Sequence, residues 1–219
     1  MSYRALDDVD NRIINAVQYL GAREGAQNVT AKKIAAICDI SDFAVFSHFG
    51  TKKGYLDAAR ESFYQRYLDK MRDLEAENAT PEMTWDTLIN DFIENPDGPA
   101  FYVSYISTFG MDDAYRKRRA TDFLPYARRL IAPERELSDD DLMILWNYMS
   151  NSILFCVSSF VKGNLECNDN VRGLMKNMAF HGLRWYNTSN IRDDFSQPTN
   201  ESMTSIYRGL NNESPYGKS

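Results

Sequence analysis

The chain has 219 residues, of which 43% are hydrophobic and 13% aromatic, and it carries a formal net charge of −6. This length leaves room for a small head and a body with its own core, and the composition suits a packed globular protein rather than a disordered acidic chain. Apolar residues recur at helical spacing nearly throughout, without alternating strand patterns, so we predict an all-α fold.

Three cysteines without C-x-x-C spacing favour reduced thiols. The first residues show no charged-then-apolar leader, and the longest apolar run, residues 153–161, is too short to cross a bilayer. We therefore expect a cytoplasmic protein that does not contact a membrane.

The first predicted helix covers residues 10–24. Its apolar residues fall on one face at three- and four-residue steps and comprise Ile13, Ile14, Val17 and Leu20. Gly25 is the expected stop.

Residues 29–56 follow the pattern of a short helix, a tight turn, a second short helix and the start of a long helix. Thr30 and Ser41 can cap the short helices, since a side-chain oxygen at that position accepts bonds from unpaired backbone N–H groups. The turn at residues 38–40 has the length found between the helices of a helix-turn-helix. Such a unit presents its second helix on a surface, and DNA is its usual ligand.

The second short helix has a face that points away from the core. Val45 and Phe49 lie one turn apart and are its natural inward residues. The outward and flanking positions are then Phe43, Ala44, Phe46 and Ser47. An outward Phe43 can pack on thymine methyl groups in a major groove, or a neighbouring helix can cover it.

Residues 10–56 resemble the DNA-binding head of the TetR family of one-component transcriptional regulators. The resemblance includes the helix of residues 10–24 and Thr30 followed by the pair Ile34 and Ala35. The recognition-helix pattern and the lysine beyond it comprise Ser41, Val45, Phe46, His48, Phe49, Thr51 and Lys52. The rest of the chain resembles the family only in length and helical character.

The resemblance implies a three-helix helix-turn-helix head over residues 1–54 and a helical effector-binding and dimerisation body over residues 55–187, with about nine helices in all. Residues 188–219 are rich in Asn, Ser, Thr, Gly and Pro, and we expect a polar, mobile tail there.

Three positions depart from the family pattern. Asp39 stands where the turn glycine is usual, and Asp is among the residues that best tolerate a left-handed backbone. Phe46 replaces a tyrosine whose hydroxyl usually reaches a phosphate, and Asp42 replaces what is often a basic or small residue. The recognition helix itself contains no Lys or Arg.

Charge placement tests the DNA-binding hypothesis. Residues 1–72 hold eleven Lys and Arg against nine Asp and Glu, a net +2, which leaves −8 for residues 73–219. The lysines at 32, 33, 52 and 53 flank the recognition helix and could neutralise phosphates, or they could form only a solvated face. The predicted DNA contacts are Thr30, Lys32, Ser41, Asp42, Phe43, Ala44, Phe46, Ser47, His48, Thr51 and Lys52.

Four further helices are predicted in the middle of the chain, at residues 53–77, 84–94, 100–109 and 113–131, with a Pro- and Gly-rich turn at residues 95–99. The buried stripe of the first comprises Leu56, Ala59, Phe63 and Tyr67. In the TetR family this long helix links the body to the head.

Aromatic side chains in these helices could line a pocket for a small apolar or aromatic effector, as in family members, or they could be ordinary core. The candidates are Trp85, Phe92, Phe101, Tyr105, Phe109 and Tyr126. The basic run at residues 116–119 could meet an anionic effector or form an exposed helix face.

Two late helices carry apolar residues on more than one side, which calls for a second packing partner. In the TetR family such a pair forms a four-helix dimer interface; the alternative is that both sides are buried within one chain. The predicted interface comprises Leu142, Trp146, Met149, Ile153, Cys156, Leu174, Met178, His181 and Trp185. Further apolar residues off this stripe include Met143, Ile144, Leu154 and Phe155.

Catalytic and metal-binding patterns are missing from the sequence. His48 and His181 have no cysteine or second histidine at metal-ligand spacing, and no nucleophile elbow or phosphate-binding glycine loop occurs. We therefore predict no enzyme, no cofactor and no metal. The sequence favours a homodimeric transcriptional regulator, a repressor released from its DNA operator by a small molecule. The alternative is a helical interaction module that kept the head but binds a protein partner.

Overall fold

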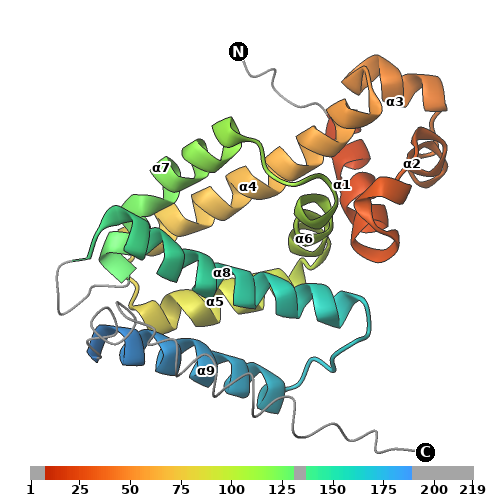
Figure 1. Cartoon of the computed structure of the whole chain (residues 1–219). Coiled ribbons are helices and arrows are strands. Elements are labelled where there is room, and N and C mark those ends of the chain that lie inside the picture. Colours follow the sequence, from red (N-terminus) through yellow and green to blue (C-terminus); the bar gives the residue numbers. More distant parts are fainter. Residues whose placement is uncertain (1–7, 131–136, 189–219) are drawn as a thin grey trace, which may run out of the picture. The chain divides into compact units, whose positions relative to one another are not determined.

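A computed structural model describes residues 8–130 and 137–188, with side chains up to residue 180. This part of the chain is all-α, as predicted, and contains nine α-helices and one 3-10 turn (Figure 1). They are α1 (Asp8–Glu24), η1 (Ala26–Asn28), α2 (Ala31–Cys38), α3 (Asp42–Phe49), α4 (Lys52–Ala76), α5 (Pro81–Glu94), α6 (Asp97–Phe109), α7 (Asp113–Leu130), α8 (Asp139–Val161) and α9 (Asp169–Thr188). The predicted tail at residues 188–219 lies almost entirely outside the described residues. The chain divides between Ala179 and Phe180 into two compact units, and the fold below is that of the first.

The helices of the predicted head share one hydrophobic cluster. The predicted inward face of α1 is fully or almost fully buried, and Gly25 ends the helix with a φ of 94°. Ile34 and Ala35 of α2 and Val45 of α3 close the cluster. Burial of these side chains, rather than helix propensity, holds helices as short as α2 and α3 in place.

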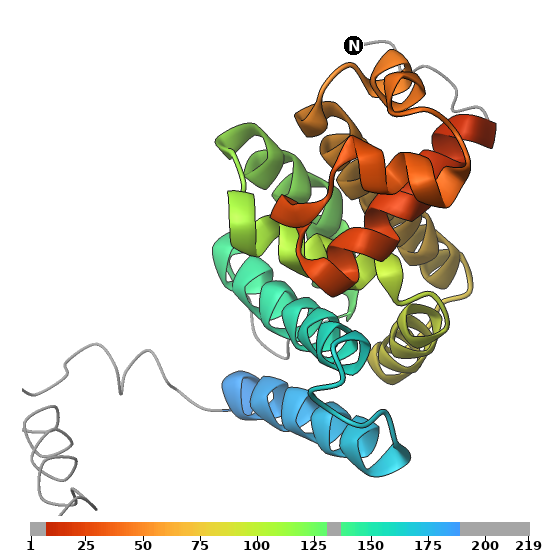
Figure 2. The ribbon, with the colours of Figure 1, turned by 90° about the vertical axis from the view of Figure 1, so that its right-hand side faces the viewer.

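Helix α6 connects the head to the body. Phe101 and Tyr105 of α6 belong to the same hydrophobic cluster as the head residues. At Gly21 of α1 an added Cβ would lie 2.4 Å from the Phe101 ring, so only glycine lets the two helices approach this closely. The buried Ala26 N–H donates to Ser104 Oγ at 2.8 Å. Figures 1 and 2 show α6 beside α1, where the sequence had suggested only α4 as the link.

The body is built around stacked aromatic rings. The predicted stripe of α4 is buried, and Tyr67 at its centre has ring centroids of Phe92, Phe123 and Trp146 at 5.6, 4.8 and 6.5 Å. These partners come from α5, α7 and α8, so one residue of α4 joins all three helices. Each aromatic pair adds about 0.5–1.5 kcal/mol to the free energy of burial.

Two helices begin three residues earlier than predicted. Helix α5 begins at Pro81, directly after the Thr80 cap, rather than at residue 84. Helix α6 begins at Asp97 and includes Gly98 and Pro99, which were predicted to form a turn. Proline fits the first turn of a helix because the N–H it lacks would have no intrahelical partner there.

Helix α8 is long and apolar enough to cross a membrane by length and composition alone, in contrast to the expectation from its longest apolar run. However, 56% of its most apolar window is buried inside the protein. Its inward residues pack on α5, α6 and α7, which explains its hydrophobicity as that of a core helix.

Candidate nucleic-acid interface

Helices α2 and α3 form the predicted helix-turn-helix. Thr30 Oγ1 accepts a hydrogen bond from the Lys33 N–H at 3.3 Å, and Ser41 Oγ accepts one from the Ala44 N–H at 3.1 Å, so both predicted caps are confirmed. Asp39 adopts φ 51° and ψ 52°, the left-handed conformation that usually falls to glycine. A non-glycine residue there costs little when its side chain is short and polar. The turn is therefore preserved despite the missing glycine.

The orientation of α3 follows from one buried anchor. Val45 is fully buried and Phe49 is half-buried, whereas Phe43 is 78% exposed and Ser47 is also exposed. Phe46 is 42% exposed. No described helix of the same chain covers Phe43, so this alternative from the sequence is wrong, and α3 presents an aromatic ring to the outside.

His48 is directed toward the protein rather than away from it. Its Nδ1 lies 2.7 Å from Oδ1 of Asp10, a residue of α1 that is only 2% exposed. In addition, Arg12 of α1 donates to the carbonyl of Cys38 at the end of α2. These contacts hold both short helices on α1. The DNA contact predicted for His48 stays a prediction. The structure adds that His48 positions α3, which the sequence did not indicate because Asp10 is distant in the chain.

Three of the four lysines around α3 have different partners, and the fourth, Lys32, is exposed. Lys52 Nζ donates to the Gln27 carbonyl at 2.6 Å. Lys33 pairs with Glu24, and Lys53 pairs with Asp57 one turn away. Ion pairs this exposed contribute roughly 0–1 kcal/mol to stability, so a DNA phosphate could replace the carboxylate partners of these lysines at a small cost in free energy. The α4 cap, Thr51, is exposed beside them.

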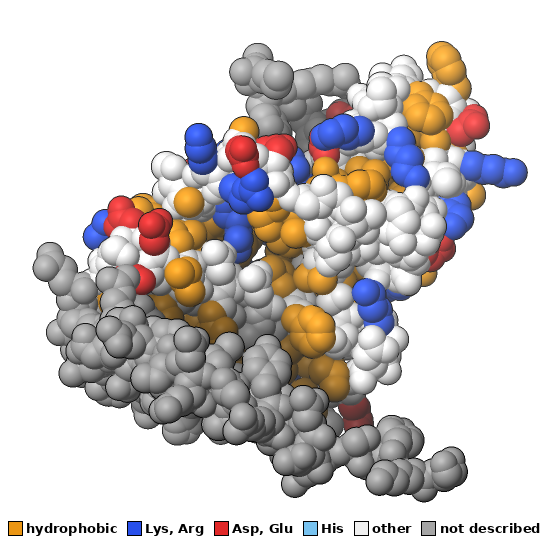
Figure 3. All heavy atoms as spheres, viewed as in Figure 1, with side chains coloured by type: hydrophobic (Ala, Val, Ile, Leu, Met, Phe, Trp, Pro, Cys, Tyr) orange, Lys and Arg blue, Asp and Glu red, His pale blue; other side chains and the backbone are white. Residues whose placement is uncertain are grey.

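Hydrophobic and basic side chains adjoin on the outer surface of the head. Figure 3 shows both kinds at the end of the molecule formed by α2 and α3. One exposed residue there, Ile37 of α2, is 50% exposed and was not singled out from the sequence. It could have been found, because Ile34 and Cys38 already occupy the inward face of that helix.

The predicted effector-pocket residues divide between the core and an open groove. Trp85, Phe92, Phe101 and Tyr126 are at most 8% exposed and pack as core. The space beside Trp85 amounts to about 10 Å³. The other two predicted residues, Tyr105 and Phe109, line an open groove against α4. The alternative that aromatic residues at helical spacing form ordinary core accounts for the buried four.

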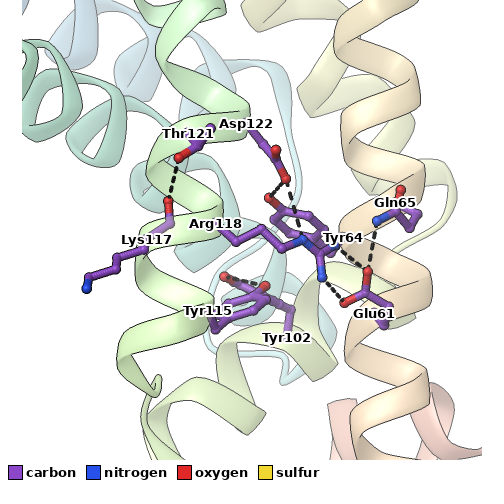
Figure 4. Close-up of polar contacts among 9 residues, drawn as sticks. All are labelled: Glu61, Tyr64, Gln65, Tyr102, Tyr115, Lys117, Arg118, Thr121 and Asp122. Carbon is purple, nitrogen blue, oxygen red and sulfur yellow. Dashed lines mark hydrogen bonds and ion pairs between the residues drawn. The ribbon is translucent and has the colours of Figure 1, made fainter. Parts of the chain in front are cut away.

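The basic run of α7 is an exposed helix face in its first half, Arg116 and Lys117, whereas Arg118 and Arg119 contact other helices. Arg118 donates to both carboxylate oxygens of Glu61 on α4, its guanidinium lies 4.5 Å from the Tyr64 ring centroid, and Tyr64 donates to Asp122 at 2.6 Å (Figure 4). Arg119 is 8% exposed and donates to Asn147 of α8 at 2.7 Å. Both arginines therefore join α7 to its neighbours. Sequence spacing could not reveal this because the acceptors belong to other helices.

The structure corrects the predicted dimer face of α8. Leu142, Trp146, Met149, Ile153 and Cys156 are at most 6% exposed within a single chain, because this stripe packs against the body. The opposite side of α8 is exposed, with Ile144 at 63% and Phe155 at 64%. Leu174 and Met178 of α9 are each 61% exposed, in keeping with their predicted availability. The side chains of His181 and Trp185 lie outside the described residues.

Solved structures with the same arrangement of helices are transcription regulators. A TetR family transcription regulator from Marinobacter aquaeolei VT8 has a TM-score of 0.62 and 16% identity, over 79% of this chain and 94% of the other. A putative TetR family regulator from Shewanella sp. PV-4 has a TM-score of 0.60 and 15% identity, over 81% and 96%. A TetR-like regulator from Rhodococcus sp. RHA1 has a TM-score of 0.58 and 13% identity, over 84% and 99%.

The fold is TetR-like and all-α, and its head contains a helix-turn-helix. No protein-family model matches the sequence, and no curated protein matches it. At these identities the structural likeness establishes the fold, while the chemistry of the site has to come from the residues of this chain.

Proposed function

We propose that this protein is a DNA-binding transcriptional regulator. The observation that carries the proposal is the exposed outer face of α3, held out by two capped helices and a buried anchor, with lysines on either side. A short helix with a bare outer face has the dimensions that a major groove accepts. The regulators with similar folds support the same proposal.

Base contacts and backbone contacts would come from different residues. Phe43, Ala44 and Ser47 would meet base edges, with Phe43 on thymine methyl groups. Lys32 and Lys52 would meet phosphates, and the N-termini at Thr30 and Thr51 would add backbone N–H donors. Since α3 has no cation, sequence preference would rest on apolar and hydroxyl contacts, and affinity would rest on the flanking lysines.

We further propose a homodimer that acts as a repressor relieved by a small effector. Ile144 and Phe155 of α8, together with Leu174 and Met178 of α9, give an exposed apolar face, and Tyr148 Oη lies 3.4 Å from the Met178 carbonyl within it. A two-fold dimer would present two recognition helices to two half-sites. An effector would act by favouring one spacing of the heads over another.

The experiment is fluorescence anisotropy with DNA that flanks the protein's own gene. Lys52→Ala should weaken binding to all sequences and reduce the salt slope by about one unit. Lys162→Ala is the matched control, because Lys162 is an exposed lysine at the far end of α8. Phe43→Ala should reduce the difference in affinity between specific DNA and random DNA. Equal affinity for Lys52→Ala and wild type across salt would refute the proposed phosphate contact.

A protein partner for the head remains the second candidate. It is favoured by the exposure of three large hydrophobic residues on α2 and α3, namely Ile37, Phe43 and Phe46. If the wild type retained no DNA at low salt, and if Phe43→Ala abolished binding to a purified protein partner, this candidate would replace the first.

A further inference from the structure

An open groove lies where the head meets the body, between the N-terminal part of α4 and the C-terminal end of α6. It encloses about 480 Å³, within the range of roughly 300–1,000 Å³ typical of small-molecule sites. Its lining residues are Lys52, Lys53, Leu56, Arg60, Tyr105, Phe109, Gly110 and Asp112. Figure 3 shows basic and hydrophobic side chains together where α4 passes α6.

The floor of the groove is apolar and partly aromatic. Tyr105 and Phe109 lie one turn apart on α6, with ring centroids 5.1 Å apart. Phe109 is 50% exposed, and Leu56 is buried beneath the rim. An exposed ring at the edge of a groove is a surface on which an aromatic or aliphatic group can pack.

The lining of the groove carries three cationic side chains, those of Lys52, Lys53 and Arg60, and one acidic side chain, that of Asp112. Lys52 and Lys53 are exposed, and Asp112 is engaged in a hydrogen bond from the Tyr115 N–H at 2.8 Å. Asp57, behind the rim, accepts from Lys53 and from the Tyr105 hydroxyl. The lining therefore has a net positive charge inside a chain whose total charge is −6.

Arg60 points to the kind of group that the groove would hold. Its guanidinium lies 4.3 Å from the Tyr115 ring centroid and 5.2 Å from that of Tyr105. Its Nε is buried and has no hydrogen-bond partner among the described residues. An arginine stacked on aromatic rings keeps its planar set of N–H donors free for a carboxylate, which it can bind through two parallel hydrogen bonds.

We propose that this groove binds a small organic carboxylate with an aromatic or aliphatic body, which packs on Tyr105 and Phe109 and places its carboxylate on Arg60 and the neighbouring lysines. The assignment deepens the proposed function, on which its regulatory part rests: the carboxylate is the effector. The groove lies apart from the buried aromatic residues Trp85, Phe92 and Tyr126, which do not line it.

The position of the groove explains how the ligand would act on DNA binding. Lys52 belongs both to the groove and to the predicted phosphate contacts, so a bound carboxylate competes with DNA for the same charge. The ligand also touches α4 and α6, and α6 packs directly on α1 of the head. A ligand that prefers one arrangement of α6 therefore favours one position of the head.

The test measures binding of three simple carboxylates, salicylate, phenylacetate and octanoate, to the full chain by calorimetry and saturation-transfer NMR. Each is compared with its uncharged amide. At least one carboxylate should bind with a Kd of about 0.01–1 mM, and its amide should bind at least about tenfold more weakly.

Two variants locate the site. Arg60→Gln should weaken carboxylate binding at least about tenfold. Arg72→Gln, on the exposed face of the same helix, should leave carboxylate binding unchanged. Because Arg60→Gln removes a stacked side chain and could disturb the fold, Phe109→Glu provides a second test at a half-exposed position. Its control is Met83→Glu, since Met83 is 51% exposed on α5. Phe109→Glu should abolish carboxylate binding, and Met83→Glu should leave it unchanged.

The outcomes separate the groove from the proposed function. Three results would refute the proposed carboxylate site, whether or not the protein binds DNA. They are no binding of any of the three carboxylates at about 10 mM, equal binding of the amides, and unchanged affinity in both groove variants. Carboxylate binding that both groove variants abolish, in a protein that retains no DNA, would support the groove and refute the regulator. Carboxylates that lower DNA affinity in the wild type, but not in Phe109→Glu, would support both.

Discussion

Single side chains in this protein are most informative where a polar atom is buried. Thr84 is 3% exposed, and its Oγ1 has no hydrogen-bond partner among the described residues. Thr80, four residues earlier, accepts a hydrogen bond from the Met83 N–H at 3.2 Å as the cap of α5. The same residue type therefore stabilises the helix at one position and adds an unpaired buried hydroxyl at the other.

We predict opposite effects for the same substitution at these two positions. Thr84→Val should leave the free energy of unfolding unchanged or raise it by up to about 1 kcal/mol, because it removes a buried hydroxyl that makes no bond. Thr80→Val should lower it by about 0.5–2 kcal/mol through loss of the cap. Urea unfolding measures both, and a clear loss of stability in Thr84→Val would show that its hydroxyl is bonded.

The cysteines give a second prediction at this scale. Cys38 and Cys156 are buried and Cys167 is exposed. Only Cys167 should therefore react quickly with a thiol reagent in the folded protein, and Cys167→Ser should abolish the fast reaction. All three should react in denaturant. Fast reaction of a second thiol without denaturant would contradict the buried placement.

Burial also raises the pKa of the Cys156 thiol from 9.0 to about 11. As the pH rises above 9, the unfolded chain loses this proton before the folded chain does. Deprotonation therefore favours the unfolded state, and the folded state becomes less stable relative to it. The free energy of unfolding should fall between about pH 9 and pH 11, by at most about 3 kcal/mol from this group. Urea titrations at each pH should show that the free energy of unfolding falls less steeply near pH 9–10 in Cys156→Ala than in the wild type. The same pH dependence in both proteins would exclude Cys156 as the source of the fall.

At the scale of the helices, the contact between α1 and α6 is the decisive packing feature. Gly21 allows the Phe101 ring to lie against α1, and Phe101 is fully buried, so it cannot move aside. This contact places the head on a body helix that also lines the groove. Helices α4 and α6 therefore both join the head to the body, and the proposed effector would act on α3 through them.

We predict that Gly21→Ala lowers the free energy of unfolding by about 1–3 kcal/mol, because the new methyl group overlaps the ring. Gly173→Ala is the matched control: its added Cβ on α9 would have no neighbour within 4 Å among the described residues. That substitution should stabilise the helix by up to about 1 kcal/mol. Equal thermal stability of Gly21→Ala and wild type would show that α1 and α6 are less closely packed than described.

At the scale of the whole molecule, the proposed dimer rests on the exposed apolar residues of α8 and α9. A monomer that exposes Phe155, Ile144, Leu174 and Met178 has a hydrophobic surface that a second chain would cover. The buried stripe of α8 is already used by its own chain, so any partner must meet the opposite side.

We predict that Phe155→Glu shifts the protein from dimer to monomer, because pairing would bury an unpaired charge. Analytical ultracentrifugation measures the shift, and Met83→Glu should remain dimeric. Because two heads bind a two-part site together, the monomer should also lose DNA affinity. A wild type that sediments as a monomer at all concentrations would refute the dimer, and a dimeric Phe155→Glu would place its interface elsewhere.

The local features of the fold could be predicted from the amino-acid sequence alone. Caps, the left-handed turn and the inward faces of α1, α3 and α4 depend on residues within one or two turns of each other, and spacing along the chain reports those directly. The outward direction of Phe43 could therefore be predicted from Val45 alone.

The partner that each helix face contacts could be read from the packed fold but not from the sequence. Spacing identified apolar stripes on α8 but could not tell that the predicted interface stripe faced the body. The pairing of His48 with Asp10 and of Arg118 with Glu61 joins residues 38 and 57 positions apart. The groove at Arg60 depends on the approach of α6 to α4. Such contacts are set by how helices pack, and packing depends on the whole set of buried surfaces rather than on any one segment.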